Sequence, residues 1–225
     1  MKMKKATKFL LGGALVILLL TPVSQVKADW HQDNIGWWYS LYRGHYYKNE
    51  EAENNGSYYK NTGAYIDGKY YKFDSRGYMI TGWQYNVYNG GDYHGWYYYD
   101  PVTGEEKRGW QLIDGKWYYF EHSALKGFKK IGDKRYYFDP VNSDMKTGWI
   151  SKQGYPGLEW YYYDPESGKQ LSGWQEIDGK KYYFGLYGAY SGHISGLDGK
   201  DYYFDSDTYE LKIGWFESGK YKYYA

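Results

Sequence analysis

The chain has 225 residues, a formal net charge of +1 and an aromatic content of 24%, with 34 tyrosines and 11 tryptophans. It contains no cysteine, which excludes disulfides, thiol nucleophiles and cysteine zinc sites. Its 28 lysines and arginines are balanced by 27 acidic residues and form no basic footprint, so we expect neither nucleic-acid binding nor attachment to an anionic membrane.

Residues 1–28 are predicted to be a signal peptide. A lysine-rich start precedes twelve apolar residues, Phe9 to Leu20, and Val26-Lys27-Ala28 supplies small residues at the cleavage positions. Twelve helical residues span about 18 Å, well short of the roughly 30 Å core of a bilayer, so a membrane anchor is disfavoured. Removal of five leader lysines changes the formal charge from +1 to −4. The mature chain is therefore expected to be secreted, mildly acidic and not inserted in a membrane.

Residues 29–62 are interpreted as a divergent first repeat and a polar loop, and residues 63–225 as a repeat array. The first repeat has its own Gly36-Trp37 pair, and residues 49–57 are almost entirely polar. We take this polar stretch as an exposed loop rather than as a domain boundary.

The array repeats a Gly-Trp pair, a turn and an aromatic run. The pairs are Gly82-Trp83, Gly109-Trp110, Gly148-Trp149, Gly173-Trp174 and Gly214-Trp215, with degenerate copies at Gly127-Phe128 and Gly192-His193. The runs are centred on Tyr71, Tyr98, Tyr119, Tyr137, Tyr162, Tyr183, Tyr203 and Tyr223, which are 18 to 27 residues apart. A period near twenty residues is typical of a stacked array.

Each unit is predicted to be a β-hairpin. Asp-Gly recurs between strand-forming segments and is the strongest short-range signal for a two-residue turn with positive φ. A looser turn rich in Asp, Pro, Ser and Gly follows the aromatic runs, and no helical period follows the leader. Strand side chains alternate between two faces, so Trp117 and Tyr119 should share one face while Tyr118 and Phe120 face the core. One such hairpin is marginal in water, which predicts that the copies stack.

These motifs resemble the cell-wall-binding repeats of Gram-positive surface proteins, known as choline-binding repeats and similar to the glucan-binding repeats of glucansucrases. The resemblance covers roughly Gly63 to the end, with a weaker match over residues 29–48. It implies an all-β solenoid, a superhelix of stacked hairpins of about 20 residues with ligand sites between successive units. It also implies a secreted protein held non-covalently at the cell wall, without a metal or other cofactor.

For choline-binding members, the resemblance implies a cage of three rings. They are the Gly-Trp tryptophan, the tryptophan that opens the same aromatic run, and a tyrosine of the next run; ring faces attract a quaternary ammonium. The middle tyrosine is selected because it shares a face with the first residue of its run. Three sets result: Trp110, Trp117 and Tyr137; Trp83, Trp96 and Tyr119; and Trp149, Trp160 and Tyr183. Elsewhere Arg135, Lys181 or Asp201 replaces the opening tryptophan, and an arginine or lysine there would repel a cation.

Several functions remain open at this point. The rings could bind choline on teichoic acids, or they could stack against an α-glucan or another polysaccharide, extended by Tyr85, Tyr88, Tyr93 and Tyr155. Many rings could instead serve only as core. An enzyme is not expected, because the five histidines show no spacing for zinc ligands, no G-x-S-x-G elbow occurs, and the recurring aspartates stand at turn positions.

Overall fold

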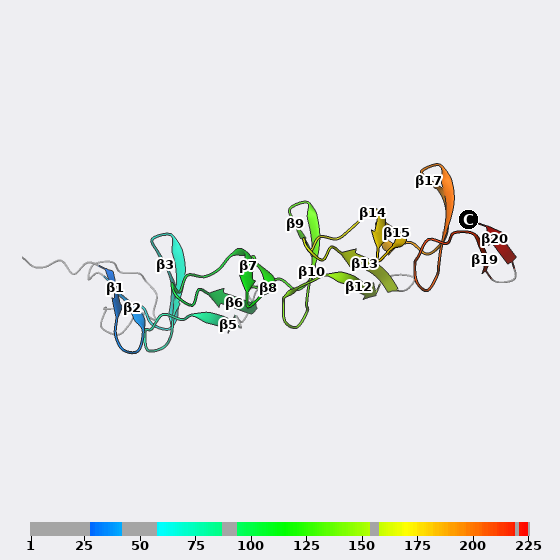
Figure 1. Cartoon of the computed structure of the whole chain (residues 1–225). Helices are drawn as coiled ribbons and strands as arrows, with labels where there is room; N and C mark the ends of the chain where they lie inside the picture. The colour runs from blue at the N-terminus through cyan, green and yellow to red at the C-terminus, as the bar shows by residue number, and fades with distance from the viewer. Residues whose placement is uncertain (1–27, 42–57, 87–93, 154–157, 219–220, 225) are drawn as a thin grey trace, which may run out of the picture. The chain divides into compact units, whose positions relative to one another are not determined.

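The computed structural model describes residues 28–41, 58–86, 94–153, 158–218 and 221–224 (Figure 1). The predicted signal peptide up to residue 27, and Tyr88, Tyr93 and Tyr155, lie outside these residues. Within the described ranges the backbone forms strands and turns but no helix, so they hold no apolar helix that could span a membrane. The chain divides into two compact units, one up to Ala64 with Lys72–Met79, and one with Tyr65–Tyr71 and everything from Ile80 onward.

Antiparallel hairpins contain nearly all the strands. The pairs are β1 (Asp29–Gln32) with β2 (Trp37–Ser40), β3 (Thr62–Ile66) with β4 (Lys69–Phe73), β5 (Gly82–Asn86) with β6 (Gly95–Tyr99), β7 (Gly109–Ile113) with β8 (Lys116–Phe120), β9 (Gly127–Ile131) with β10 (Lys134–Phe138), β12 (Gly148–Gln153) with β13 (Leu158–Tyr163), β14 (Gly173–Ile177) with β15 (Lys180–Gly185), β17 (Gly192–Leu197) with β18 (Lys200–Phe204), and β19 (Trp215–Ser218) with β20 (Tyr221–Tyr224). Two short third strands, β11 (Met145–Lys146) and β16 (Gly188–Ala189), pair with β10 and β15. The all-β prediction of hairpin repeats is confirmed.

The hairpin turns have the predicted geometry. Asp114 and Gly115 have φ angles of 49° and 75°, the two positive values that a type I′ turn requires. The other Asp-Gly turns, at Asp67, Asp178 and Asp198, also have positive φ angles at both the aspartate and the glycine. These aspartates therefore have a structural reason to recur.

The glycine of the Gly-Trp pair is required by backbone conformation rather than by crowding. Gly109 has a φ of +66°, and no heavy atom lies within 4 Å of the position that a Cβ would occupy. Residues with a Cβ rarely adopt such a φ. The glycine thus sets the direction in which the chain enters the strand that carries Trp110.

An aspartate after the aromatic run organises the second turn. The Asp100 carboxylate accepts hydrogen bonds from the backbone N–H groups of Val102 and Thr103, both at 2.9 Å, and pairs with Lys107 at 2.8 Å. The hydrogen bond from Lys107, followed by those from the backbone, holds the pKa of Asp100 well below its usual range. Asp139 and Asp205 lie in equivalent turns. This geometry confirms the turn prediction.

Backbone hydrogen bonds join successive repeats of the second unit. In several repeats, the residue that follows the second turn donates its N–H to the carbonyl of the residue that opens the preceding aromatic run. These bonds run from Ala124 to Trp96 at 2.7 Å, from Gln170 to Arg135 at 2.9 Å, and from Leu211 to Lys181 at 2.8 Å. These repeats are therefore fixed to their predecessors at the residue that opens the aromatic run.

The two faces of a hairpin differ in burial, as predicted. Tyr118 and Phe120 are 8% and 2% exposed and belong to a buried cluster with Ile113. Trp117, on the opposite face, is 43% exposed. The face that carries Phe120 therefore forms core, and the face that carries Trp117 remains available for a ligand.

Candidate ligand-binding sites between repeats

Trp110 lies where two hairpins meet. It is paired in register with Tyr119 of its own hairpin, and their ring centroids are 5.1 Å apart. On its other side, the indole contacts Tyr136 at 4.8 Å and Phe138 at 5.9 Å, both from β10 of the next hairpin. The part of this face that carries Trp110 thus packs on the core face of the next hairpin, while Trp117 on the same face remains exposed.

Three rings form a corner at this junction. The rings of Trp110 and Trp117 are 6.3 Å apart and inclined by 83°, while Trp110 and Tyr136 are inclined by 65°. The preceding junction repeats this geometry: Trp83 lies 6.3 Å from Trp96 at 89° and 4.9 Å from Tyr118 at 64°. Steeply inclined rings enclose a volume from several sides, which suits a compact cation better than a flat ligand.

The third ring differs from the sequence prediction. The structure places Tyr136, rather than Tyr137, against Trp110; the ring contacts of Tyr137 are with Phe128 and Tyr163. The reason is that the next hairpin turns its buried face toward the tryptophan, and alternation assigns that face to the first tyrosine of the pair. By the same rule Tyr118 takes the place predicted for Tyr119, and Tyr182 that predicted for Tyr183. Tyr119 and Tyr183 contact Trp110 and Trp174 of their own hairpins.

The third predicted set is only partly brought together. Trp149 contacts Tyr182 of the next hairpin at 5.1 Å, as Trp110 contacts Tyr136. Trp160 lies on the same strand face but is paired with Ser151, and among the described residues no ring contact joins it to Trp149. At the other two sites the residue opposite the opening tryptophan is the larger Leu112 or Tyr85. A serine gives the Trp160 indole little surface to rest on.

Family comparisons match a segment that contains the Trp110 and Trp149 sites. A choline-binding repeat matches residues 125–173, and a putative cell wall binding repeat matches residues 109–121 and 172–185. The matched residues, 109–121 and 125–185, include the rings of the Trp110 site and Trp149 with Tyr182. No curated protein sequence matches it significantly.

Solved structures with the same fold are choline-binding proteins. Choline binding protein F from Streptococcus pneumoniae, in the presence of a peptidoglycan analogue, is 30% identical over 70% of this chain and 53% of that chain, with a TM-score of 0.58. A second crystal form is 27% identical over 85% and 61% of the two chains, with a TM-score of 0.62. CbpF in complex with ipratropium is 28% identical over 79% and 58%, with a TM-score of 0.59. The chain thus spans little more than half the length of these proteins.

One choline-binding repeat has an internal cation at its ring. Phe128 replaces the Gly-Trp tryptophan and contacts Tyr137 at 4.5 Å and Tyr161 at 5.9 Å. The Lys152 ammonium lies over the Phe128 ring, 5.7 Å from its centroid, and Arg135 stands where the opening tryptophan would be. Burial, together with a hydrogen bond to Glu159, raises the pKa of Tyr161 to about 12. The Phe128 ring therefore already faces a cation of the protein itself, the Lys152 ammonium.

Another repeat keeps two rings and has a charged third position. Trp174 contacts Tyr202 of the next hairpin at 4.9 Å and 70°, and its indole N–H donates to the Asp198 carboxylate at 2.8 Å. Lys181 occupies the position of the opening tryptophan. In the next repeat, Asp201 occupies that position and lies 3.6 Å from His193.

Metal-binding geometry is absent from the described part of the chain, which contains no group of three or more potential ligands among His, Asp and Glu side chains. The segment at residues 205–210 is a second turn: Asp205 accepts backbone hydrogen bonds from Asp207 and Thr208 and pairs with Lys212. Asp205 therefore serves the turn, while Glu210 pairs with Lys180 at 2.6 Å.

Proposed function

We propose that this protein attaches to a cell wall by binding choline on teichoic acids through the aromatic corners between its repeats. The observation that carries the proposal is the corner of Trp110, Trp117 and Tyr136, which lies within the segment matched by the choline-binding and cell-wall-binding repeats. Its walls are inclined by 83° and 65°. Such an arrangement surrounds a quaternary ammonium with ring faces.

A single corner would bind weakly. A cation over one ring gains about 0.5 to 2 kcal/mol, so three rings supply roughly 2 to 5 kcal/mol, which corresponds to a dissociation constant near millimolar. A polymer that displays choline repeatedly can engage several corners at once. If its spacing fits, avidity increases by about 10² to 10⁴ without any new contact.

Similarity to choline binding protein F supports a wall-associated ligand, since that protein was solved in the presence of a peptidoglycan analogue, a tetrasaccharide-pentapeptide. The ring geometry favours choline over a polysaccharide. Stacking of sugars calls for a flat row of rings, whereas Trp96 is inclined by 89° to Trp83 and by 66° to Tyr85.

We also propose that the protein is secreted, is held non-covalently at the cell surface and has no catalytic role. The predicted leader supports secretion, and the repeats support non-covalent attachment to the surface. A binding role without catalysis is supported by the turn function of the recurring aspartates. The protein would then coat the wall, or hold another molecule there.

The test is a calorimetric and tryptophan-fluorescence titration of residues 29–225 with choline chloride. Parallel titrations use an α-glucan oligomer and sodium chloride. We expect saturable binding of choline in the millimolar range and no response to sodium chloride. A response to the glucan without one to choline would replace the proposal with polysaccharide binding, and silence with both would leave the rings as core.

A further inference from the structure

Three cations gather where the hairpin β9–β10 meets the next hairpin, β12–β13. Lys130 and Arg135 are directly opposite each other in register, and both are exposed. They share a strand face with Phe128 and Tyr137, whose ring centroids are 4.5 Å apart. The Lys152 ammonium reaches the same face from β12 and lies 5.7 Å from the centroid of the Phe128 ring. We call Lys130, Arg135 and Lys152 the cationic junction.

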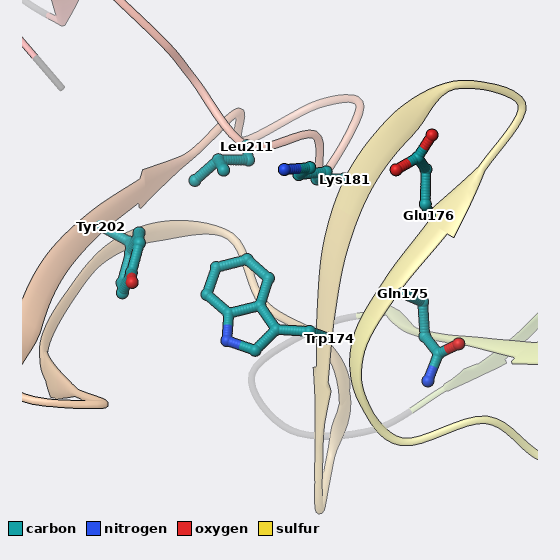
Figure 2. A pocket seen from close by; sticks show the side chains of 6 residues that line it. All are labelled: Trp174, Gln175, Glu176, Lys181, Tyr202 and Leu211. Atoms are coloured by element: carbon teal, nitrogen blue, oxygen red, sulfur yellow. The ribbon is translucent and has the colours of Figure 1, made fainter.

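The opposed cations of β9–β10 have no counterpart in the hairpin β14–β15. There, Lys181 occupies the position of Arg135 and is directly opposite Glu176. Figure 2 shows both side chains among those that line the pocket at that junction. In β9–β10 the residue opposite the cation is a second cation, Lys130. Like charges directly opposite each other destabilise a strand pair, so the stability of this hairpin gives no reason for the arrangement.

A second replacement adds positive charge at the same junction. In three other repeats, the lysine after the hairpin turn pairs with an acidic residue of the next second turn: Lys69 with Glu105 at 2.9 Å, Lys116 with Asp144 at 3.9 Å, and Lys180 with Glu210 at 2.6 Å. Here the lysine is Lys134, and Lys169 takes the place of the acid, because its carbonyl accepts the N–H of the turn aspartate as the carbonyls of those acids do. Lys134 pairs instead with the neighbouring Asp133 at 3.0 Å.

The cationic junction keeps an excess of positive charge. Among the ion pairs of the described residues, none includes Lys130, Arg135 or Lys152. Glu159 is directly opposite Lys152 and accepts a hydrogen bond from the Tyr161 hydroxyl at 2.7 Å. Burial raises the pKa of Tyr161, and the Arg135 charge opposes that rise, so Arg135 acts on a ring of the next hairpin. Three positive charges and one negative charge leave a net charge of +2.

We propose that the cationic junction binds a phosphate group. The Arg135 guanidinium presents a planar fork of donors that matches phosphate oxygens, and the two ammonium groups add further donors. A phosphate monoester carries a charge of about −1.5 to −2 at neutral pH, which balances the charge of the site. A quaternary ammonium would be repelled here, so the inference goes beyond the proposed choline binding and does not depend on it. A free phosphate and the phosphodiester of a polymer share the chemistry that this junction recognises.

The test is a calorimetric titration of the mature chain, residues 29–225, at low ionic strength, where exposed charges are least screened. Inorganic phosphate and a choline-free poly(glycerol phosphate) are the two phosphate probes, and poly-glutamate is the carboxylate control. We expect saturable binding of phosphate and weaker binding of poly-glutamate at equal charge. Tighter binding of the polymer, counted per phosphate, would identify a phosphodiester as the source. Tighter binding of inorganic phosphate would identify a free phosphate.

Two variants and a matched control locate the site. Lys130→Gln and Arg135→Gln should each weaken phosphate binding about two- to fivefold, as the loss of one exposed charge pair does. Lys129→Gln removes the same charge from the next position of β9, but Lys129 is opposite Tyr136 on the other strand face, so phosphate binding should be retained. Without phosphate, Lys130→Gln should melt at a higher temperature than Lys129→Gln, because it relieves the repulsion with Arg135.

Three binding results would overturn the proposal: no saturable phosphate binding, equal binding of poly-glutamate, or an equal loss of binding in Lys129→Gln. A lower melting temperature in Lys130→Gln than in Lys129→Gln would also overturn it, since Lys130 would then serve the fold. Choline binding at the Trp110 corner should be unchanged in all three variants. A failure of the phosphate site is therefore distinguishable from a failure of the proposed function.

Discussion

Replacing Trp117 with alanine should remove one wall of the Trp110 site and leave the hairpin folded. The indole is 43% exposed, and its ring contact is an edge-on one with Trp110 at 6.3 Å. Loss of such a pair costs about 0.5 to 1.5 kcal/mol of stability. Loss of one ring around an ammonium costs about 0.5 to 2 kcal/mol of binding, so this site should bind choline roughly two- to thirtyfold more weakly.

Phe120→Ala should instead destabilise the fold. Phe120 is 2% exposed and lies in the buried cluster of its hairpin, and such a truncation costs about 3 to 5 kcal/mol of stability. The assay is a thermal melt followed by circular dichroism, paired with calorimetric titration of choline. Trp215→Ala is the control for choline binding, since Trp215 is 68% exposed and contacts Tyr224 of its own hairpin edge-on at 5.2 Å. It should lower stability about as much as Trp117→Ala but leave choline binding at the Trp110 site unchanged. Equal loss of structure in Trp117→Ala and Phe120→Ala, or unchanged choline binding in Trp117→Ala, would refute the division between the two faces.

Four further outcomes are expected. Lys181→Trp should add a choline site, seen as higher stoichiometry in equilibrium dialysis; unchanged stoichiometry would contradict the assignment of the missing wall. Arg135→Trp alone should add no choline site, because the Lys152 ammonium covers the Phe128 ring. The double variant Arg135→Trp with Lys152→Ala should bind one more choline in equilibrium dialysis. An extra choline in the single variant would contradict this role of Lys152. Gly109→Ala should lower the free energy of unfolding, measured by urea denaturation, by about 1 to 2 kcal/mol, because alanine disfavours the positive φ at this position. An unchanged free energy of unfolding would argue against a conformational role for this glycine. The turn aspartates have lowered pKa values in the folded protein, so their full stabilisation is present above the unfolded-state pKa of about 3.9. The melting temperature should therefore fall as the pH drops below about 4. A constant melting temperature down to pH 3 would be inconsistent with this linkage.

Turns and strand faces could be predicted from the sequence because their causes are local. Asp114-Gly115 specifies its turn by backbone conformation alone, and alternation along β8 separates Trp117 from Phe120. These rules need only the residues of one hairpin. They accounted for the hairpin repeats and for the two sides of each hairpin.

The third ring of each site could not be obtained in the same way. Its identity depends on which face the next hairpin turns toward Trp110, and that is decided by packing between repeats. Alternation assigned the first tyrosine of the pair to the core face, but it did not indicate that this face meets the tryptophan of the preceding hairpin, as Tyr136 meets Trp110. The position of Lys152 over Phe128 was equally hidden, because the extended strand β12 brings together residues that lie far apart in the sequence.

The placement of Trp110 gives a bound ligand a mechanical role. Its indole contacts Tyr119 of one repeat and Tyr136 of the next, so a ligand seated at that corner would bind the two repeats only while they remain stacked. By mass action such a ligand stabilises the junction by about 2.7 kcal/mol at a hundred times its dissociation constant. The repeats of a protein attached to the wall would therefore separate less readily under force than those of the free protein. The junction would lose this stabilisation when the ligand dissociates.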